Sequence, residues 1–278
     1  MVLSIPAKAE AEIMDMKKAS SGLVVESRDG VMSIRIAVEN EGNRLLPEAL
    51  AQLEQIGNSL AAAHDIHAVL IIGEGRNHFS TGILNPVIRG AMAKEDVVAL
   101  VRLANRAFNA IEAAPQVVVA GINGDVRAGG AELALACDIR IVASHAKMQF
   151  PEAAWGGFPG AGGPYRLASI VGRGRALELI CTGRSIDAAE MERLGLVQSV
   201  HPAEELADAA RSLALQIAKA GPLATRGAKR MIRARLDPGL EHAKDISDAL
   251  RHELEWSDDV DEAIAAHREA RTPVFTGR

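Results

Sequence analysis

The sequence predicts an α/β fold, and three observations support this prediction. A hairpin pattern opens the chain, short apolar runs then alternate with helical stretches, and only helical spacing follows Pro202. Apolar strands that each follow a helix indicate parallel pairing, with helices covering the sheet. We therefore expect an α/β core that begins with antiparallel strands and ends in helices.

The elements of this core can be assigned in chain order. Leu23 to Val38 alternates apolar and polar residues around the turn Asp29-Gly30, which is typical of a hairpin. Three helix-to-strand units follow: Pro47 to His64 before Ala68 to Ile72, Lys94 to Ala114 before Val117 to Ala120, and Ala131 to Cys137 before Ile139 to Val142.

The last quarter of the chain has helical periodicity alone. Apolar residues recur there at spacings of three and four, namely Leu206, Ala210, Leu213 and Ile217, and then Ile246, Leu250 and Leu254, with turn signals at Gly221-Pro222 and Asp237-Pro238-Gly239. We predict a flexible N-terminal extension over 1–21, a core that carries the active site over 22–200, and a helical oligomerisation region over 201–278.

Composition and charge exclude several classes of protein. Hydrophobic residues make up 48%, charged residues 24% and aromatic residues 3% of the chain, and the net charge is −5. No apolar run is long enough for a membrane span, and there is neither a basic surface for phosphates nor an aromatic platform for bases. The two cysteines, Cys137 and Cys181, cannot build a disulfide framework, and this fits a cytoplasmic protein.

The most informative stretch is Ala120 to Ser144, where an apolar strand ends in a glycine-rich turn that opens a short helix. Gly129 and Gly130 there allow a ligand to approach the main chain, and the helix start leaves N–H groups for an anion or an oxyanion. The stretch does not match a dinucleotide or nucleoside triphosphate motif. Taken alone, the glycine pair is better explained as a turn.

Two glutamates are candidates for acid–base chemistry. Glu132 falls in the first turn of that helix, and Glu152 follows 20 residues later beside Phe150, Pro151, Trp155 and Phe158. Two carboxyl groups that meet in an apolar pocket can act as acid and base. The alternative for Glu132 is a solvated residue that complements the helix dipole. Sequence spacing does not show whether the two glutamates meet.

Three ordered blocks of the sequence resemble a known family. Gly73 to Leu84 (GEGRNHFSTGIL), Ala120 to Val142, and Pro151-Glu152 with Phe158 to Gly163 (FPGAGG) are similar to the signature of the crotonase, or enoyl-CoA hydratase/isomerase, superfamily. The resemblance covers nearly everything from Leu23 onward. It implies a crotonase-type spiral of repeated β-β-α units, followed by C-terminal helices that assemble trimers or hexamers.

The resemblance also implies site residues and a reaction. The backbone N–H groups of Ile83 and Gly129 would grip the thioester carbonyl of an acyl-CoA, Glu132 would deprotonate water, and Glu152 would protonate the α-carbon. The expected substrate contacts are Ser80, Gly82, Gly130, Trp155 and Phe158. No metal or other cofactor is expected, because coenzyme A is part of the substrate.

The retention of both glutamates favours hydration of a 2-enoyl-CoA, or the reverse dehydration, over other reactions of the family. The alternatives are an enoyl-CoA isomerase, another enzyme that stabilises an enolate of an acyl-CoA, and a non-catalytic homologue that binds acyl-CoA or a partner protein.

The chain departs from the family pattern at a few positions. Ala128 replaces a usual glycine, Leu84-Asn85 replaces a frequent acidic residue, and Arg127 stands where a small or apolar residue is common. We expect Arg127 to pair with Asp125; the alternatives are that it points to solvent or contacts an anionic substrate group.

Other residues are weaker candidates for a functional role. A basic helical face could attract CoA phosphates or, more simply, be solvated or paired, and it consists of Arg226, Lys229, Arg230 and Arg233. Arg76 is a second phosphate candidate. His64 and His67 have weak metal-ligand spacing, and Cys137 is expected to be buried. Met148 is expected either in the core or in the acyl pocket, and the segment from Val87 to Phe108 is expected to shape that pocket.

Overall fold

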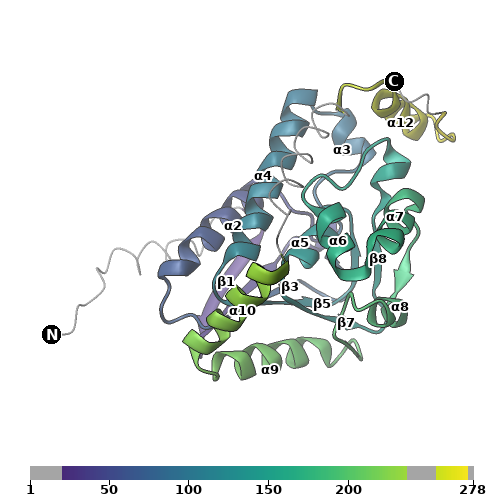
Figure 1. The fold of residues 1–278 in the computed structure, drawn as a ribbon. Coiled ribbons are helices and arrows are strands. Elements are labelled where there is room, and N and C mark those ends of the chain that lie inside the picture. The colour runs from purple at the N-terminus through teal and green to yellow at the C-terminus, as the bar shows by residue number, and fades with distance from the viewer. Residues whose placement is uncertain (1–20, 237–254, 275–278) are drawn as a thin grey trace.

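The computed structural model describes residues 21–236 and 255–274, and Figure 1 shows how helices surround its sheets. The predicted extension before Ser21, the turn at 237–239 and the apolar repeat of Ile246, Leu250 and Leu254 lie outside the described residues. The elements that were predicted within the described ranges are present, with small shifts of their ends.

The larger sheet has six strands in the order β1-β2-β3-β5-β7-β10. Its first two strands form the predicted antiparallel hairpin, and Asp29 and Gly30 at the turn adopt φ of 56° and 77°. All other neighbours pair in parallel. The strands are β1 (Leu23–Arg28), β2 (Val31–Ile36), β3 (Ala68–Gly73), β5 (Val117–Ile122), β7 (Ile139–Ala143) and β10 (Ser199–His201).

A smaller sheet has four strands in the order β4-β6-β8-β9. Its strands are β4 (His78–Ser80), β6 (Asp125–Arg127), β8 (Lys147–Gln149) and β9 (Ile186–Asp187). The chain places β3, β5 and β7 in the first sheet and the strands that directly follow them, β4, β6 and β8, in the second. This repetition is the predicted crotonase-type spiral.

Helices follow or separate these strand pairs. They are α2 (Pro47–Ser59), α3 (Pro86–Gly90), α4 (Lys94–Ala113), α5 (Gly129–Ala136), α6 (Gly163–Val171), α7 (Arg173–Thr182), α8 (Ala188–Arg193), α9 (Leu206–Ala218), α10 (Pro222–Leu236) and α12 (Asp258–Arg268), with short 3-10 helices η2 (Glu39–Glu41), η3 (Leu60–Ala62) and η4 (Pro151–Trp155). In Figure 1, α2 and α4 lie on one side of the larger sheet and α9 lies on the other.

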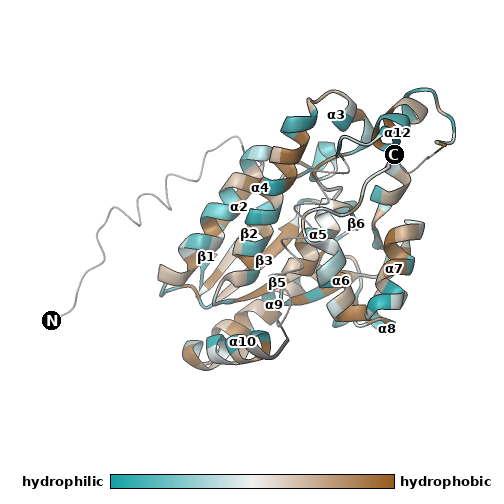
Figure 2. Ribbon diagram, turned by 45° about the horizontal axis from the view of Figure 1, so that its top comes forward, coloured by the Kyte–Doolittle hydropathy of each residue, from teal (hydrophilic) through white to brown (hydrophobic). Residues whose placement is uncertain are grey.

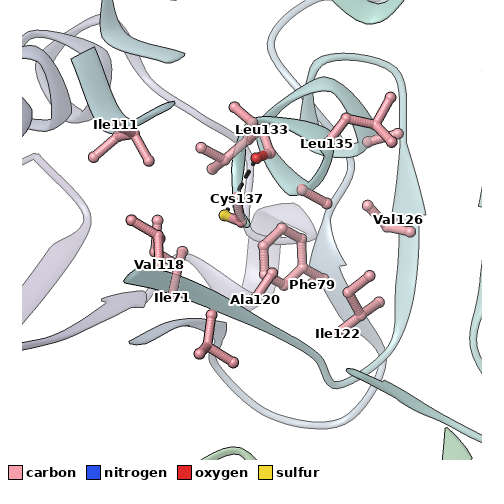
Figure 3. Packing of buried hydrophobic residues seen from close by; sticks show 14 of the residues in the cluster. Ile71, Phe79, Ile111, Val118, Ala120, Ile122, Val126, Leu133, Leu135 and Cys137 are labelled. Atoms are coloured by element: carbon pink, nitrogen blue, oxygen red, sulfur yellow. Dashed lines mark hydrogen bonds between the residues drawn. The ribbon is translucent and has the colours of Figure 1, made fainter. Parts of the chain in front are cut away.

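The core fills the space between the sheets and their helices. Figure 2 shows mainly hydrophobic residues on β3 and β5, between α4 and α9. In Figure 3, Leu133 and Cys137 from α5 and its C-terminal end lie beside Val118 and Phe79 of neighbouring strands. Every residue of α5 is buried, as expected for a helix in which all residues except Glu132 are small or apolar. The core therefore holds α5, and the turn before it, in a fixed position.

The described C-terminal region is helical, as predicted. Helix α9 buries Leu206, Ala210, Ala214 and Ala218, while the predicted Leu213 and Ile217 are partly buried against the core. Helix α12 packs against α3 and η4. Among the described residues, no helix has both the length and the apolar character required to cross a lipid bilayer.

Candidate active site

A cavity of about 50 Å³ lies where α5, the loop after β4, η4 and the loop before α6 meet. We call it the reaction pocket, and its lining comprises Ile83, Leu84, Asn85, Pro86, Arg89, Val101, Ala128, Gly129, Glu132, Glu152, Trp155, Gly157, Phe158, Gly160 and Ala161. Its volume exceeds the ~10–15 Å³ that one water requires. The pocket combines apolar walls with two carboxyl groups and one guanidinium.

Two backbone amides, those of Ile83 and Gly129, lie close together beside this pocket. Helix α5 begins at Gly129, and Ile83 N lies 3.4 Å from the position that a Cβ on Gly129 would occupy. Within the described residues, neither the Ile83 N–H nor the Gly129 N–H has a protein acceptor. The first amides of a helix point out of it and carry its positive dipole. Together the two amides can bind an oxygen on which negative charge develops.

Glycines make this close approach of α5 and β4 sterically acceptable. A Cβ on Gly130 would lie 2.4 Å from Ser80 O, and a Cβ on Gly82 would lie 2.8 Å from Gly129 N. Gly82 also has a φ of 93°, which side-chain-bearing residues rarely adopt. These glycines therefore position the amides of Ile83 and Gly129. The sequence resemblance identified both amides but did not show how close together they lie.

Glu132 is the only charged residue of α5 and is 3% exposed. Its Oε1 accepts hydrogen bonds from Ala161 N and Gly163 N, both at 2.8 Å. Such a buried carboxylate requires hydrogen-bond donors. The alternative interpretation of Glu132 as a solvated residue at the helix start is therefore wrong, because the loop before α6 folds over the carboxylate and shields it from water.

The loop that holds Glu132 is itself braced by Arg166. The side chain of Arg166 is 3% exposed, and it donates to Ala161 O at 2.9 Å and to both carboxylate oxygens of Glu112. The Glu112 carboxylate raises the pKa of the Arg166 guanidinium against the effect of its burial. The bidentate pair thus fixes the loop whose amides orient Glu132.

Glu152 reaches the same pocket from η4. Its side chain is half-buried, as are Trp155 and Phe158, which line the pocket with it. Phe150, the other aromatic residue near Glu152 in sequence, belongs to the core instead. The structure thus brings together two glutamates whose meeting could not be read from the sequence.

The other predicted substrate contacts lie around the pocket. Ser80 is fully buried and its Oγ accepts from Gly82 N at 3.1 Å, so Ser80 braces the turn. Neither Ser80, Gly82 nor Gly130 lines the reaction pocket. Gly82 lines a neighbouring cavity of about 270 Å³, which also contacts Arg44 and Arg127 and shares Ile83 and Trp155 with the reaction pocket.

Two of the unusual residues beside the amides, Arg127 and Asn85, have structural explanations. Arg127 pairs with Asp125 at 3.2 Å on an exposed surface, as expected. Asn85 caps the start of α3, because its Oδ1 accepts from Ile88 N at 2.9 Å. Ala128, in the usual place of a glycine, has φ 48° and ψ −130°, a conformation that is strained for any residue with a side chain.

The basic face on α10 is largely paired with the protein. Lys229 Nζ contacts Asp138 Oδ2 at 2.6 Å, Arg226 donates to Ile66 O, and Arg233 donates to Glu112 O. Burial raises the pKa of the Asp138 carboxyl, and Lys229 opposes this effect. These contacts attach α10 to the core, in agreement with the structural alternative.

The remaining candidates lie outside the reaction pocket. Arg76 lines a separate cavity beside α9, and His67 Nδ1 contacts Ala218 O at 3.0 Å. Met148 is part of the core. Cys137 is buried as predicted, and burial raises the pKa of its thiol to about 12. Among the described residues, no cluster of three or more His, Cys, Asp or Glu side chains is arranged to hold a metal ion.

One charged residue of the pocket was not among the candidates that the sequence indicated. Arg89 lines the pocket and pairs with Glu255, which is 166 residues away in the chain. The feature of the sequence that could have indicated Arg89 is its place, as a cation, in the segment from Val87 to Phe108, which was expected to shape the acyl pocket. Arg89 and Val101 are the residues of this segment that line the pocket.

The β-β-α spiral, with two sheets around a central buried helix, defines the crotonase class of α/β proteins. The sequence pattern of the enoyl-CoA hydratase/isomerase family matches residues 26–278. The chain therefore belongs to the enoyl-CoA hydratase/isomerase family, whose members act on acyl-CoA thioesters.

Individual relatives agree with this assignment. YngF of Bacillus subtilis, which bears the family's name, is 36% identical over 236 residues, 84% of this chain and 90% of its own. The 2,3-dehydroadipyl-CoA hydratase of Escherichia coli is 30% identical over 259 residues, 93% of this chain and all of its own. The crystal structure of an enoyl-CoA hydratase from Bacillus anthracis is 34% identical, with a TM-score of 0.74 over 92% of this chain and 100% of its own.

Proposed function

We propose that the protein adds water in syn fashion to a 2-enoyl-CoA, or catalyses the reverse dehydration of a 3-hydroxyacyl-CoA. One observation carries the proposal: two glutamates from separate elements line one pocket beside two amides that lack a protein acceptor among the described residues. This is the set of groups that hydration requires, since the reaction moves two protons and builds charge on one oxygen.

In this mechanism the thioester oxygen accepts hydrogen bonds from Ile83 N–H and Gly129 N–H. Glu132, oriented by the amides of the loop before α6, removes a proton from water as the water oxygen bonds to the β-carbon. The electrons of the double bond move towards the thioester oxygen and form an enolate. Glu152 then donates a proton to the α-carbon. Each amide donor is worth roughly 3–4 kcal/mol to such a transition state.

The steps are balanced without any further reagent. Glu132 gains the proton that water loses, Glu152 loses the proton that the α-carbon gains, and exchange with solvent restores both residues. The proposed chemistry uses carboxyl and amide groups of the chain, with coenzyme A as part of the substrate and with no metal or redox cofactor.

The test follows the absorbance of the conjugated enoyl thioester when crotonyl-CoA is mixed with the protein. We expect the absorbance to fall as 3-hydroxybutyryl-CoA forms, and Glu132→Gln and Glu152→Gln each to lower turnover by ~10²–10⁴. Glu54→Gln is the matched control, because Glu54 pairs with Arg106 outside the pocket. Near-native rates in both folded pocket variants would refute the mechanism, and a shifted double bond without added water would indicate an isomerase.

We also propose that the protein is a cytoplasmic homotrimer or hexamer. The low cysteine content supports a reducing compartment. Family membership supports the oligomer, together with three apolar residues of α10 that are largely exposed in the single chain, Leu223 at 83%, Met231 at 73% and Ile232 at 60%. Sedimentation should give a trimer or a hexamer at micromolar concentration, and a monomer would contradict the proposal.

A further inference from the structure

Arg89 is a buried cation in the wall of the reaction pocket that the proposed mechanism does not use. It lies on α3, its side chain is 8% exposed, and it lines the pocket together with Glu132 and Glu152. A buried guanidinium is costly unless its N–H groups are hydrogen-bonded. The partners of Arg89 therefore indicate what the pocket is built to contact.

Glu255 satisfies two of the three guanidinium nitrogens of Arg89. Nε donates to Oε1 at 3.2 Å, Nη2 donates to Oε2, and the Glu255 side chain is 2% exposed. A two-pronged pair of this kind fixes the plane of the guanidinium. Because Glu255 precedes α12, the pair also ties this C-terminal segment to the pocket.

The third nitrogen, Nη1, has no protein acceptor in residues 21–236 or 255–274. It lies 3.1 Å from the position that a Cβ on Gly157 would occupy, and Gly157 lines the reaction pocket. The geometry thus leaves one fixed, charged donor at the pocket wall, while both other nitrogens are held by Glu255.

Neighbouring cavities indicate which end of a substrate would meet Arg89. The cavity lined by Arg44 and Arg127 adjoins Ile83 and has no carboxylate in its lining. Both arginines pair with carboxylates outside this lining, Arg44 with Glu41 and Arg127 with Asp125, and they give the cavity its positive charge, so it suits the phosphate-bearing CoA portion. Arg89 does not line that cavity and borders instead a cavity of about 300 Å³ against α12. Its donor is therefore assigned to the acyl portion.

We infer that Arg89 is a specificity-determining residue, whose Nη1 donates a hydrogen bond to an uncharged oxygen on the acyl chain, beyond the double bond. This inference rests on the proposed function, because it assigns the acyl portion of an acyl-CoA to the reaction pocket. The preferred substrate class is then an enoyl-CoA whose acyl chain carries a ketone or hydroxyl group.

The local charges favour an uncharged oxygen over a carboxylate. In the proposed mechanism Glu132 acts as a base and is ionised, and Glu255 pairs with Arg89, so two carboxylates accompany the single guanidinium at this pocket. An additional carboxylate on the substrate would meet like charge in a poorly hydrated pocket. A ketone or hydroxyl oxygen accepts the hydrogen bond without this repulsion.

The test compares the binding of saturated acyl-CoAs, so that it does not depend on turnover. Pentanoyl-CoA, 4-oxopentanoyl-CoA, 5-hydroxypentanoyl-CoA and glutaryl-CoA have five acyl carbons each and are titrated calorimetrically into the full chain. We expect the keto or the hydroxy compound to bind roughly tenfold or more tighter than pentanoyl-CoA, as a hydrogen bond to a charged group allows. Glutaryl-CoA should bind more weakly than the tighter of these two compounds.

Variants identify Arg89 as the source of this preference. The double variant Arg89→Met, Glu255→Leu removes both buried charges together, and it should reduce the preference to within about threefold. Arg89→Lys retains the charge but loses the fork geometry, and it should lose the preference as well. The control is Lys229→Met, which breaks a buried ion pair outside the pocket, and should lower stability while the preference persists.

Equal affinity for pentanoyl-CoA and its keto and hydroxy analogues would overturn the inference. It would also be overturned if glutaryl-CoA bound the most tightly of the four compounds, or if the folded double variant kept the preference for the keto or hydroxy compound. Hydration of crotonyl-CoA, which has no oxygen beyond its double bond, tests the proposed function separately. If the protein prefers the keto or hydroxy acyl-CoA but does not hydrate crotonyl-CoA, only the proposed hydratase activity is refuted. If it hydrates crotonyl-CoA but shows no such preference, only the proposed role of Arg89 is refuted.

Discussion

Replacing Gly130 with alanine inserts a methyl group into the contact between α5 and β4. A Cβ at this position would lie 2.4 Å from Ser80 O and 2.8 Å from Ser80 Cβ. The nearest atom belongs to the backbone, so no side-chain rotation relieves the clash. One of the two segments must move.

The size of this movement follows from the distances. Ordinary contact begins near 3.4 Å, so the oxygen and the new methyl group must separate by about 1 Å (3.4 − 2.4). Gly129, which lines the pocket, is the adjacent residue, and we expect it to be displaced by a similar amount. A misplacement of about 1 Å costs roughly 10²-fold in rate. Overpacking costs about 1–3 kcal/mol, offset by up to about 1 kcal/mol because alanine favours the helix over glycine.

The assay combines urea unfolding with the hydration rate of crotonyl-CoA. We expect Gly130→Ala to fold, with stability lowered by about 1 kcal/mol and turnover lowered by roughly 10². Gly174→Ala is the matched control: a Cβ at Gly174 in α7 meets nothing within 4 Å, so this change should stabilise the protein and leave turnover unaltered. Native turnover in Gly130→Ala would refute the reasoning about the amide position.

Three further predictions follow from the structure. Ala128→Gly relieves about 1–3 kcal/mol of backbone strain and loses about 0.8 kcal/mol of methyl burial. Urea unfolding should therefore show a free energy of unfolding at least as large as that of the native protein. A decrease of more than about 1 kcal/mol would contradict the presence of strain at Ala128. A thiol reagent should modify Cys181 in the native protein and Cys137 only after unfolding, since Cys137 is buried with a pKa raised to about 12; modification of both in the native state would contradict this. Arg184 and Arg175 lower the pKa of Glu178 from 4.5 to about 2. The ionised Glu178 therefore stabilises the folded protein fully above pH 4.5, and this stabilisation is lost as the pH falls towards 2. The variant Glu178→Gln should make the free energy of unfolding less dependent on pH over this range, and an unchanged pH dependence would count against the pairing.

The fold could be predicted because its signals are local. The hairpin around Asp29-Gly30 and the strand Ala68–Gly73 each show their period in the printed sequence, and the structure contains both. The glycine-rich turn before α5 was also visible. A local sequence pattern does not show which distant segments contact each other, such as Gly130 and Ser80, which are about 50 residues apart in the chain.

The site was harder to predict for the same reason. The first turn of a helix is usually solvated, and Glu132 is buried only because the loop at Ala161 and Gly163 returns over it. The pair of Arg89 and Glu255 joins a five-residue helix to the segment before α12. No periodicity relates such residues, so only the folded chain shows that a cation lies in the pocket.

We propose that Glu132 and Glu152 hydrate the double bond of an enoyl-CoA while two amides hold its thioester oxygen. The most direct test is the mass of the product formed from crotonyl-CoA in D₂O. We expect 3-hydroxybutyryl-CoA with one stable deuterium at the α-carbon, delivered by exchanged Glu152, and little product in Glu152→Gln. Recovery of unchanged crotonyl-CoA, or of an isomer that has gained no water, would contradict the proposal.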